Sequence, residues 1–215
     1  MKIQILVDIK DSFFIQYLSI LKLRIKKLKH KVKILKSHKK IEKGDILFLI
    51  SCKTILKNNY LKKNKKNIVI HPSKLPLGKG SGAVAWNILS GKKDLYVSLF
   101  EATNKLDSGD IYIQKKVTLN GYELNHEIRK KQANLTINSI MLFLKNYKKI
   151  KPFKQSGKTS FYRKRNKSDS EININKSIKN QFNLLRVVDN DSYPAFFKNK
   201  KKTYILKIYS QNEKN

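Results

Sequence analysis

The chain of 215 residues is poor in cysteine, glycine and proline, with one Cys, eight Gly and four Pro. A single Cys excludes a disulfide within the chain and a zinc centre built from several thiolates. The shortage of Gly and Pro excludes collagen-like and low-complexity chains. The lack of a disulfide is compatible with a reducing compartment.

Long apolar runs are also missing. The longest, Ile46–Ile50 with its neighbours, is far shorter than the ~20 residues that a helix needs to cross a membrane. Near the N-terminus, Asp8 interrupts the stretch that would have to be continuously apolar in a signal peptide, and no small-residue cleavage site follows. We therefore expect a cytoplasmic protein without a membrane partner.

Acidic residues are few, because 15 Asp and Glu stand against 48 Lys and Arg, which gives a formal net charge of +33. Only five of the basic residues are Arg, although base readout and bidentate phosphate contacts favour Arg. The lysines are spread from Lys2 to Lys214 instead of forming one cluster. We interpret the charge as a compositional bias of solvated positions. The alternative is an attraction for nucleic acid or other phosphates.

The sequence does contain enough apolar residues for a core, with 40% hydrophobic residues, ten Phe and ten Tyr. In the first half, strand-like and helix-like segments alternate, which is typical of a parallel sheet with crossover helices. Strands are expected at Lys2–Val7, Lys31–Leu35, Ile46–Ile50 and Asn67–Ile70, and a helix after Asp11. No G-x-G-x-x-G or P-loop motif occurs. We predict an α/β fold with a Rossmann-like, mostly parallel sheet flanked by helices.

The second half continues this pattern and then changes character. It predicts helices over 83–91 and Glu123–Leu144, and strands over Leu95–Glu101 and Ile111–Leu119. Residues 152–171 are polar and turn-rich, and they precede a helix within Ile174–Val188 and a strand at Thr203–Tyr209. We predict one domain over 1–150 and a small C-terminal extension over 151–215 that packs on it.

Two side chains are candidates for chemistry. His71 ends an expected strand at a loop rich in Pro and Gly, and Asp107 opens the tight turn Asp-Ser-Gly-Asp before another strand. In a parallel sheet both would reach the same edge, where a His and a carboxylate can move protons and support an oxyanion. The alternatives are a structural His and an Asp that caps its own turn. Cys52 is a weaker candidate for a nucleophile, and no spacing typical of a metal site occurs.

An ordered set of segments over roughly 67–145 resembles the folate-dependent formyltransferase family. This family includes methionyl-tRNA formyltransferase, glycinamide ribonucleotide transformylase and the sugar-nucleotide N-formyltransferases. The segments are Asn67-Ile-Val-Ile-His71-Pro-Ser73-Lys-Leu75-Pro76, Lys79-Gly80, Ala83-Val-Ala-Trp86-Asn-Ile88-Leu89, Val97-Ser-Leu-Phe and Leu106-Asp107-Ser-Gly109-Asp110-Ile111. Each piece is common by itself, whereas the ordered set is specific.

The resemblance implies that N10-formyltetrahydrofolate is the formyl donor and that no metal takes part. An amine would attack the formyl carbon, His71 would hydrogen-bond or protonate the oxyanion, and Asp107 would orient His71 and accept a proton. The pterin would lie against the loop after the strand at 46–50 and against the loop at 102–107. The residues assigned to the donor are Ser51, Cys52, Ile55, Leu56, Thr103 and Leu106.

The sequence departs from the family at Val69, where the family normally has an Asn two residues before the His. Removing one oxyanion donor typically costs about 2.7–4 kcal/mol. Asn67 lies on the same strand face but about 6.6 Å further back, so it cannot simply replace the missing side chain. Another donor from the loop 72–82, a mechanism that relies on His71 and Asp107, or low activity would each account for Val69.

The resemblance is strongest to the sugar-nucleotide N-formyltransferases of the PseJ-like type. The tRNA enzyme carries a C-terminal barrel that some 64 residues after Lys151 would hardly form, and the first strand lacks the Gly-rich phosphate loop of the purine enzyme. The acceptor would then be a nucleotide-linked amino sugar of surface glycan biosynthesis, bound by Ser73, Lys79, Gly80, Tyr162, Arg163 and Arg165. For these arginines a salt bridge within the extension is the alternative.

Two other functions stay open at this point. One is methionyl-tRNA formyltransferase, and the other is a non-catalytic, basic relative that binds nucleic acid through its charge of +33. The sequence does not decide whether the chain forms a homodimer.

Overall fold

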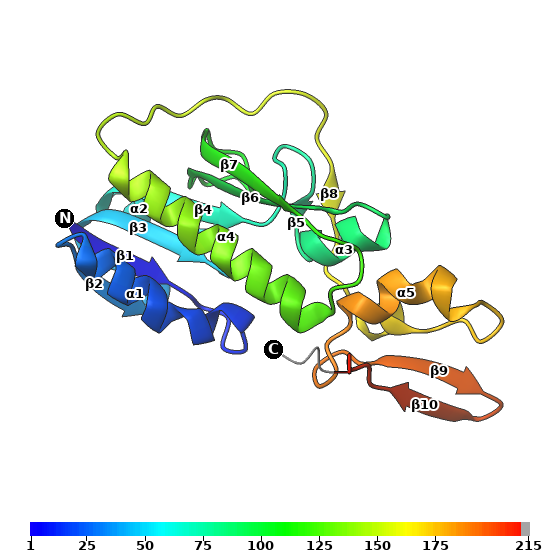
Figure 1. Ribbon diagram of the computed structural model, residues 1–215. Helices are drawn as coiled ribbons and strands as arrows, with labels where there is room; N and C mark the ends of the chain where they lie inside the picture. Colours follow the sequence, from blue (N-terminus) through cyan, green and yellow to red (C-terminus); the bar gives the residue numbers. More distant parts are fainter. Residues whose placement is uncertain (212–215) are drawn as a thin grey trace.

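The computed structural model describes residues 1–211, and its centre is a six-stranded sheet with the order β2-β1-β3-β4-β6-β7 (Figure 1). The first four of these strands are parallel, whereas β6 runs antiparallel to β4 and β7 antiparallel to β6. The strands are β1 (Lys2–Leu6), β2 (Lys31–Leu35), β3 (Gly44–Ile50), β4 (Asn64–His71), β6 (Asp94–Glu101) and β7 (Ile111–Thr118). The prediction of a mostly parallel α/β sheet is confirmed.

Alternating residues of the central strands divide the core between the two faces of the sheet. In β3, Ile46, Phe48 and Ile50 face the helices α1 (Leu18–Lys27) and α4 (Asn125–Lys145), which lie on one side of the sheet (Figure 1). Leu47 and Leu49 point to the opposite side. There they pack with the loop after β3 and the short helix α2 (Asn58–Leu61). This period of two is the reason why the apolar run of β3 is buried on both sides.

Several boundaries differ from those expected. After Asp11, Ser12 caps a 3₁₀ turn, η1 (Phe13–Tyr17), before α1 begins. The helix expected within 174–188 is α5 (Ile178–Val187), because the Ser177 side chain accepts a hydrogen bond from the Asn180 amide and so starts the helix there. The last strand, β10 (Lys202–Leu206), ends before Tyr209 and pairs with a strand that was not predicted, β9 (Ala195–Asn199).

The chain after α4 packs on the first 150 residues. It crosses the molecule as an extended segment and reaches β8 (Phe161–Tyr162), which pairs with β5 (Lys79–Gly80) (Figure 1). The short η3 (Lys167–Ser170) follows, and α5 then lies beside α3 (Ala83–Leu89). The extension also has a small apolar cluster of its own, built from Ile172, Leu185, Val188 and Ala195. The division into 1–150 and 151–215 stays a prediction.

A buried ion pair links α5 to the segment before α4. The Arg186 guanidinium donates to a Glu123 carboxylate oxygen at 2.9 Å and to the Glu123 carbonyl at 2.9 Å, and both residues are buried. Burial by itself would raise the pKa of Glu123. Hydrogen bonds from Lys131 and from the backbone amides of Asn120 and Gly121 outweigh this effect and lower its pKa to about 2. The extension is therefore attached by a pair whose carboxylate stays charged over a wide pH range.

We expect Glu123→Gln to lower the free energy of unfolding at neutral pH by about 3–5 kcal/mol, because it leaves the Arg186 charge buried without its partner. A depressed pKa in the folded state contributes stability above the ordinary value of 4.5, and this stability is lost as the pH falls towards about 2. The difference in the free energy of unfolding between wild type and Glu123→Gln should therefore shrink as the pH falls from 4.5 to about 2. Denaturant unfolding at several pH values measures it, with Glu42→Gln, at the exposed ion pairs with Lys2 and Lys33, as a control that should have a much smaller effect. An equal difference at all pH values would contradict the assignment.

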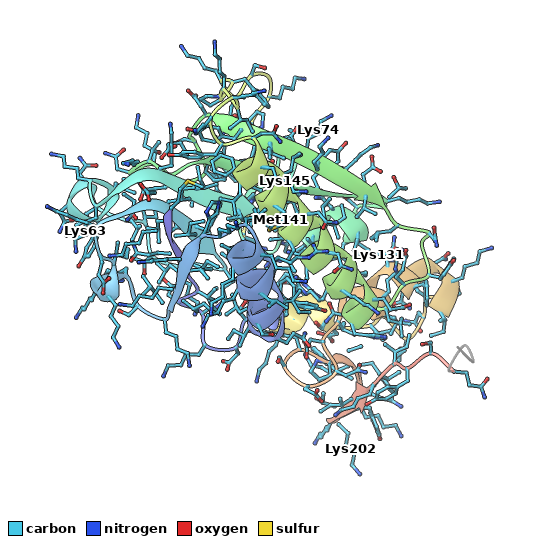
Figure 2. The ribbon with its side chains drawn as sticks, turned by 60° about the vertical axis from the view of Figure 1, so that its left-hand side comes forward. Lys63, Lys74, Lys131, Met141, Lys145 and Lys202 are labelled. Carbon is cyan, nitrogen blue, oxygen red and sulfur yellow. The ribbon has the colours of Figure 1, made fainter. Side chains whose placement is uncertain are left out.

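The basic charge is distributed over many elements. The lysines labelled in Figure 2 come from the turn before β4, the loop after β4, α4 and β10, and they lie on different sides of the molecule: Lys63, Lys74, Lys131, Lys145 and Lys202. This distribution is compatible with the interpretation as compositional bias. Of the helices within residues 1–211, none combines the length and the apolar character needed to cross a membrane.

Candidate active site

His71 is the last residue of β4, and the residue is 7% exposed. Its Nε2 atom lies 2.8 Å from the carbonyl oxygen of Gly78. Because a carbonyl oxygen only accepts hydrogen bonds, Nε2 carries the hydrogen in this ring orientation. The other ring nitrogen, Nδ1, faces Asp107 at a distance of 3.7 Å from Oδ2. Nδ1 is therefore the ring atom that is left to exchange a proton.

Asp107 is 8% exposed and lies in the loop between β6 and β7. Its backbone has a φ of +45°, a left-handed conformation that Asp tolerates better than most residues. Oδ2 accepts a hydrogen bond of 2.9 Å from the Gly80 amide, and the Gln155 side chain donates to the Asp107 carbonyl at 3.0 Å. The Asp107 carboxylate is thus held by β5, and the Asp107 backbone carbonyl is held by the C-terminal extension.

The two candidate catalytic groups converge, but the predicted reason for their convergence was wrong. Because β6 is antiparallel to β4, its last residue, Glu101, lies opposite Ile68 and not at the end of β4 where His71 pairs with Ser98. The loop 102–110 has to run back by roughly 10 Å along the strand direction. The close packing of Gly109 makes this return possible, since a Cβ there would lie 1.8 Å from the Glu101 carbonyl oxygen.

The expected role of Asp107 in orienting His71 also needs correction. A distance of 3.7 Å suits an ion pair but is too long for a hydrogen bond. The ring is instead oriented by the Gly78 carbonyl, and Gly78 is fixed in turn by the hydrogen bond of 2.8 Å from its amide to the Ser160 hydroxyl. Gly78 has a φ of +71°, and a Cβ at this position would lie 2.9 Å from the Tyr162 ring.

The two segments assigned to the folate donor lie side by side. Cys52 and Leu56, from the loop after β3, share an apolar cluster with Val69 on β4 and Ala102 in the loop after β6. The loop after β3 is held by the Asp8 carboxylate, which accepts hydrogen bonds from the amides of residues 53 and 54. Val69 packs in this cluster, so an apolar side chain occupies the position at which the family normally has an Asn.

The predicted donor residues differ in what they could offer to a ligand. Ile55 and Leu106 expose about half of their apolar side chains, 51% and 47%, whereas Leu56 is buried within the protein. Ser51 has a φ of +51°, and the Thr103 hydroxyl lies 2.9 Å from that of Ser108. Leu56 could therefore serve the donor only through its backbone.

Cys52 has the properties of a structural thiol. Its sulfur donates to the Leu6 carbonyl oxygen at 3.3 Å, and burial, with a smaller effect of the nearby Asp8 carboxylate, raises its pKa to about 12. At neutral pH the thiol is therefore almost completely protonated, whereas a nucleophile would have to be a thiolate. The nucleophile hypothesis for Cys52 finds no support in this geometry.

We expect Cys52 in the native protein to react with iodoacetamide at pH 8 at least about 100-fold more slowly than in the unfolded chain, because only the thiolate reacts. Mass spectrometry of the alkylated fraction over time measures this rate. Unfolded protein in guanidinium chloride is the matched control. Equal rates in the two states would show that the thiol is accessible and ionisable in the folded protein.

The predicted acceptor residues surround the loop 72–82. Ser73 is completely buried, and its hydroxyl has no hydrogen-bond partner within the described part of the chain. Lys79 and Gly80 form β5, which pairs with Phe161 and Tyr162. The Tyr162 ring stacks on Trp86, and its hydroxyl donates to the Asn87 side chain at 2.9 Å. These residues are brought together as expected, while their role in acceptor binding stays a prediction.

Both arginines assigned to the acceptor already have partners inside the extension. Arg163 forms a salt bridge with Asp169 and covers the Trp86 ring at 4.7 Å. Arg165 donates to the Asp169 carbonyl at 3.0 Å and to the Ser170 hydroxyl at 3.3 Å. The alternative interpretation, a salt bridge within the extension, is what the structure has at Arg163. The preference for Arg over Lys at these positions is explained by these planar and bidentate contacts.

Sequence reasoning missed Gly78, Gln155 and Ser160. The Gln155 side chain donates to the carbonyls of Asp107 and Gly109, and Ser160 holds Gly78, which in turn accepts from His71. Each of these hydrogen bonds has a backbone group as one of its partners. No pattern in a polar, turn-rich segment indicates such contacts.

A pocket of about 350 Å³ contains neither His71 nor Asp107. It lies between the loop 74–77 and the segment 153–158, and its lining includes Gln155 and three lysines: Lys74, Lys154 and Lys158. Within residues 1–211, no three His, Cys, Asp or Glu side chains are grouped so that they could hold a metal ion.

Comparison with known proteins identifies the class to which this fold and site belong. The profile of the family described as Formyl transferase matches residues 18–142, more than half of the chain. The chain therefore belongs to the formyl transferase family, as its ordered motifs indicated.

Individual relatives and structures agree with this result. Methionyl-tRNA formyltransferase of Malacoplasma penetrans is 30% identical over 150 residues, which cover 68% of this chain and 47% of the relative. This chain thus spans about half the length of that relative. Three solved structures share the fold at lower identity.

The structure of methionyl-tRNA formyltransferase from Clostridium thermocellum superposes with a TM-score of 0.81 at 20% identity, over 100% of this chain and 95% of the other. A 4-N formyltransferase from Francisella tularensis gives 0.78 at 17% identity, over 98% of each chain. HypX from Aquifex aeolicus in complex with tetrahydrofolic acid gives 0.82 at 19% identity, over 99% of this chain and 38% of HypX.

Proposed function

We propose that this chain is an N-formyltransferase that moves a formyl group from N10-formyltetrahydrofolate to the amine of a nucleotide-linked amino sugar. The observation that carries the proposal is the approach of His71 and Asp107 to 3.7 Å in a member of the formyl transferase family. Both groups are more than nine-tenths buried, so a reaction beside them would be largely shielded from water.

The reaction needs one proton acceptor and one group that stabilises negative charge. The acceptor amine attacks the formyl carbon, the formyl oxygen becomes an oxyanion, and the bond from carbon to N10 then breaks. The attacking amine loses a proton to Asp107, directly or through water, and Asp107 passes a proton to N10 by the same route as the bond from carbon to N10 breaks. His71 donates a hydrogen bond from protonated Nδ1 to the oxyanion, because Nε2 is already committed to Gly78.

Support for the folate donor comes from family membership and from the arrangement of two loops. The tetrahydrofolic acid complex of HypX shows that a structure with this fold binds the product form of the donor. In this chain the loop after β3 and the loop after β6 meet beside Val69, and they expose the apolar side chains of Ile55 and Leu106. A flat, partly apolar pterin is suited to such a surface.

The structure constrains the identity of the acceptor less than that of the formyl donor. A pocket of about 350 Å³ lies next to the catalytic loop, and its lining includes three lysines and no carboxylate. This size and charge suit a small phosphorylated acceptor. A sugar N-formyltransferase from Shewanella shares the fold over 100% of this chain, with a TM-score of 0.71 at 14% identity, and this supports an amino-sugar class. Since both substrates are charged and do not cross membranes unaided, we keep the expectation of a cytoplasmic enzyme.

Methionyl-tRNA is the second candidate acceptor. It is favoured by the relative from Malacoplasma penetrans, by the structure from Clostridium thermocellum and by the net charge of +33. An aminoacyl end offers the same nucleophile, a primary amine next to a phosphodiester chain. The chemistry at His71 and Asp107 would be unchanged.

One experiment separates these possibilities. Purified protein and N10-formyltetrahydrofolate are incubated with a panel of nucleotide-linked amino sugars, with methionyl-tRNA, and with N-acetylated sugar nucleotides that lack a nucleophilic amine. Release of tetrahydrofolate and the mass of the product are measured. We expect formylation of an amino sugar and no reaction of its N-acetylated form. Formylation of methionyl-tRNA alone would establish the second candidate, while salt-dependent RNA binding without folate binding would indicate a non-catalytic relative.

A further inference from the structure

Gln155 occupies an unusual place between the C-terminal extension and the catalytic loop. It lies on the segment that leads from α4 to β8, and its side-chain nitrogen is 3.0 Å from the Asp107 carbonyl oxygen and 2.9 Å from that of Gly109. One amide group thus donates both of its hydrogens to two carbonyls of the same turn. Neither of these hydrogen bonds goes to the carboxylate of Asp107 or to His71.

The turn that Gln155 contacts has an unfavourable backbone conformation. Asp107 has a φ of +45°, which is sterically disfavoured for a residue with a side chain, and the loop 102–110 runs back along β6. Within residues 1–211, the Asp107 carboxylate accepts a single hydrogen bond from another element, that of the Gly80 amide at 2.9 Å. A small rotation of the turn would therefore move Oδ2 relative to both Gly80 and His71.

The segment that carries Gln155 is firmly attached. Phe153 exchanges two backbone hydrogen bonds with Ile111 at the start of β7, at 2.8 and 2.9 Å. This places Gln155 two residues beyond a fixed point. The oxygen of the same side-chain amide, Oε1, is buried without a hydrogen-bond partner in the described residues. A buried, unpaired acceptor is destabilising, so stability alone does not account for this side chain.

We propose that Gln155 is a positioning residue for formyl transfer: its side-chain amide fixes the turn 107–109 and thereby sets the distance of the Asp107 carboxylate from His71. The inference rests on the proposed function, since it assigns Asp107 to proton transfer. It differs from a catalytic role, because Gln155 reaches only backbone carbonyls.

The test compares four proteins: wild type, Gln155→Ala, Gln155→Glu and the control Thr159→Ala. Gln155→Glu keeps the shape but can only accept hydrogen bonds at neutral pH, so it tests donation to the two carbonyls. Thr159 is an exposed residue on the same segment, its side chain makes no hydrogen bond among the described residues, and it does not line the pocket. Thermal unfolding of each variant is recorded to confirm that it is folded.

We expect Gln155→Ala and Gln155→Glu to lower kcat by about 10–100-fold, because displacements of the order of 1 Å at a reacting group have effects of this size. KM for N10-formyltetrahydrofolate should stay unchanged, since Gln155 makes no hydrogen bond to any of the six residues assigned to the donor. Thr159→Ala should behave as wild type. Unchanged kcat in both Gln155 variants would overturn the proposal, and so would losses of kcat that follow only from partial unfolding.

A second measurement is independent of activity. The Gly80 amide donates to the Asp107 carboxylate, so its hydrogen exchange reports the position of that carboxylate. We expect faster exchange at Gly80 in Gln155→Ala and no change in Thr159→Ala. If the wild type formylates none of the acceptors, the proposed function fails, and this measurement alone decides whether Gln155 positions Asp107. Unchanged exchange at Gly80 would reject the positioning role even in an active enzyme.

Discussion

Replacing His71 by Ala should lower kcat for formyl transfer by about 10²–10⁴-fold, the usual contribution of a general acid or base. The imidazole is held with Nε2 on the Gly78 carbonyl and Nδ1 towards Asp107, so Nδ1 is the ring nitrogen that is left to donate to the formyl oxygen. Val69 removes the Asn that would share this task in the family. The effect at His71 should therefore lie towards the upper end of the range.

The measurement is steady-state release of tetrahydrofolate with the acceptor identified above. His126→Ala is the matched control, because His126 is exposed on α4 and its side chain makes no hydrogen bond or ion pair among the described residues. Binding of the donor should be retained by His71→Ala, which separates a catalytic defect from a folding defect. Activity close to that of wild type would show that the oxyanion is stabilised elsewhere and would remove the central residue of the mechanism.

Replacing Asp107 by Asn should lower kcat by a similar factor, about 10²–10⁴-fold. The side chain would lose its charge and its ability to accept the proton of the attacking amine. Asn is the suitable substitution because it tolerates a φ of +45° and its carbonyl can still accept the Gly80 amide. The backbone of the turn should therefore stay in place, and the loss should report the missing proton acceptor.

Asp110→Asn is the control within the same Asp-Ser-Gly-Asp turn. The carboxylate of Asp110 makes no hydrogen bond or ion pair among the described residues, although its carbonyl accepts the Glu101 amide. We expect this variant to keep the activity of wild type. A loss at Asp110 as large as that at Asp107 would mean that the turn responds to any change of charge, and the assignment of the proton acceptor would be wrong.

Part of the site could be predicted because its residues have recognisable local surroundings. His71 follows a buried strand and precedes Pro72, and Asp107 precedes a turn that contains Gly109. Such positions are typical of side chains at strand ends. The approach of the two groups was predicted for the wrong reason, since an alternating strand pattern is the same in parallel and antiparallel sheets.

Other parts could not be predicted. Gln155 contacts the carbonyl of Asp107, 48 residues away, and backbone carbonyls are the same at every position of a chain. For Arg163 the sequence offered both an acceptor contact and a salt bridge, and only the folded extension places Asp169 next to it.

The amino-acid sequence by itself determined the α/β class, the family and the two side chains that carry the proposed chemistry, because these depend on apolar periodicity and on short motifs in a fixed order. The tertiary structure decided the direction of β6 and β7, the orientation of the His71 ring and the attachment of the catalytic turn to the extension. These features depend on contacts between segments distant in the chain, and the free energy of such contacts is defined only when the whole chain has packed.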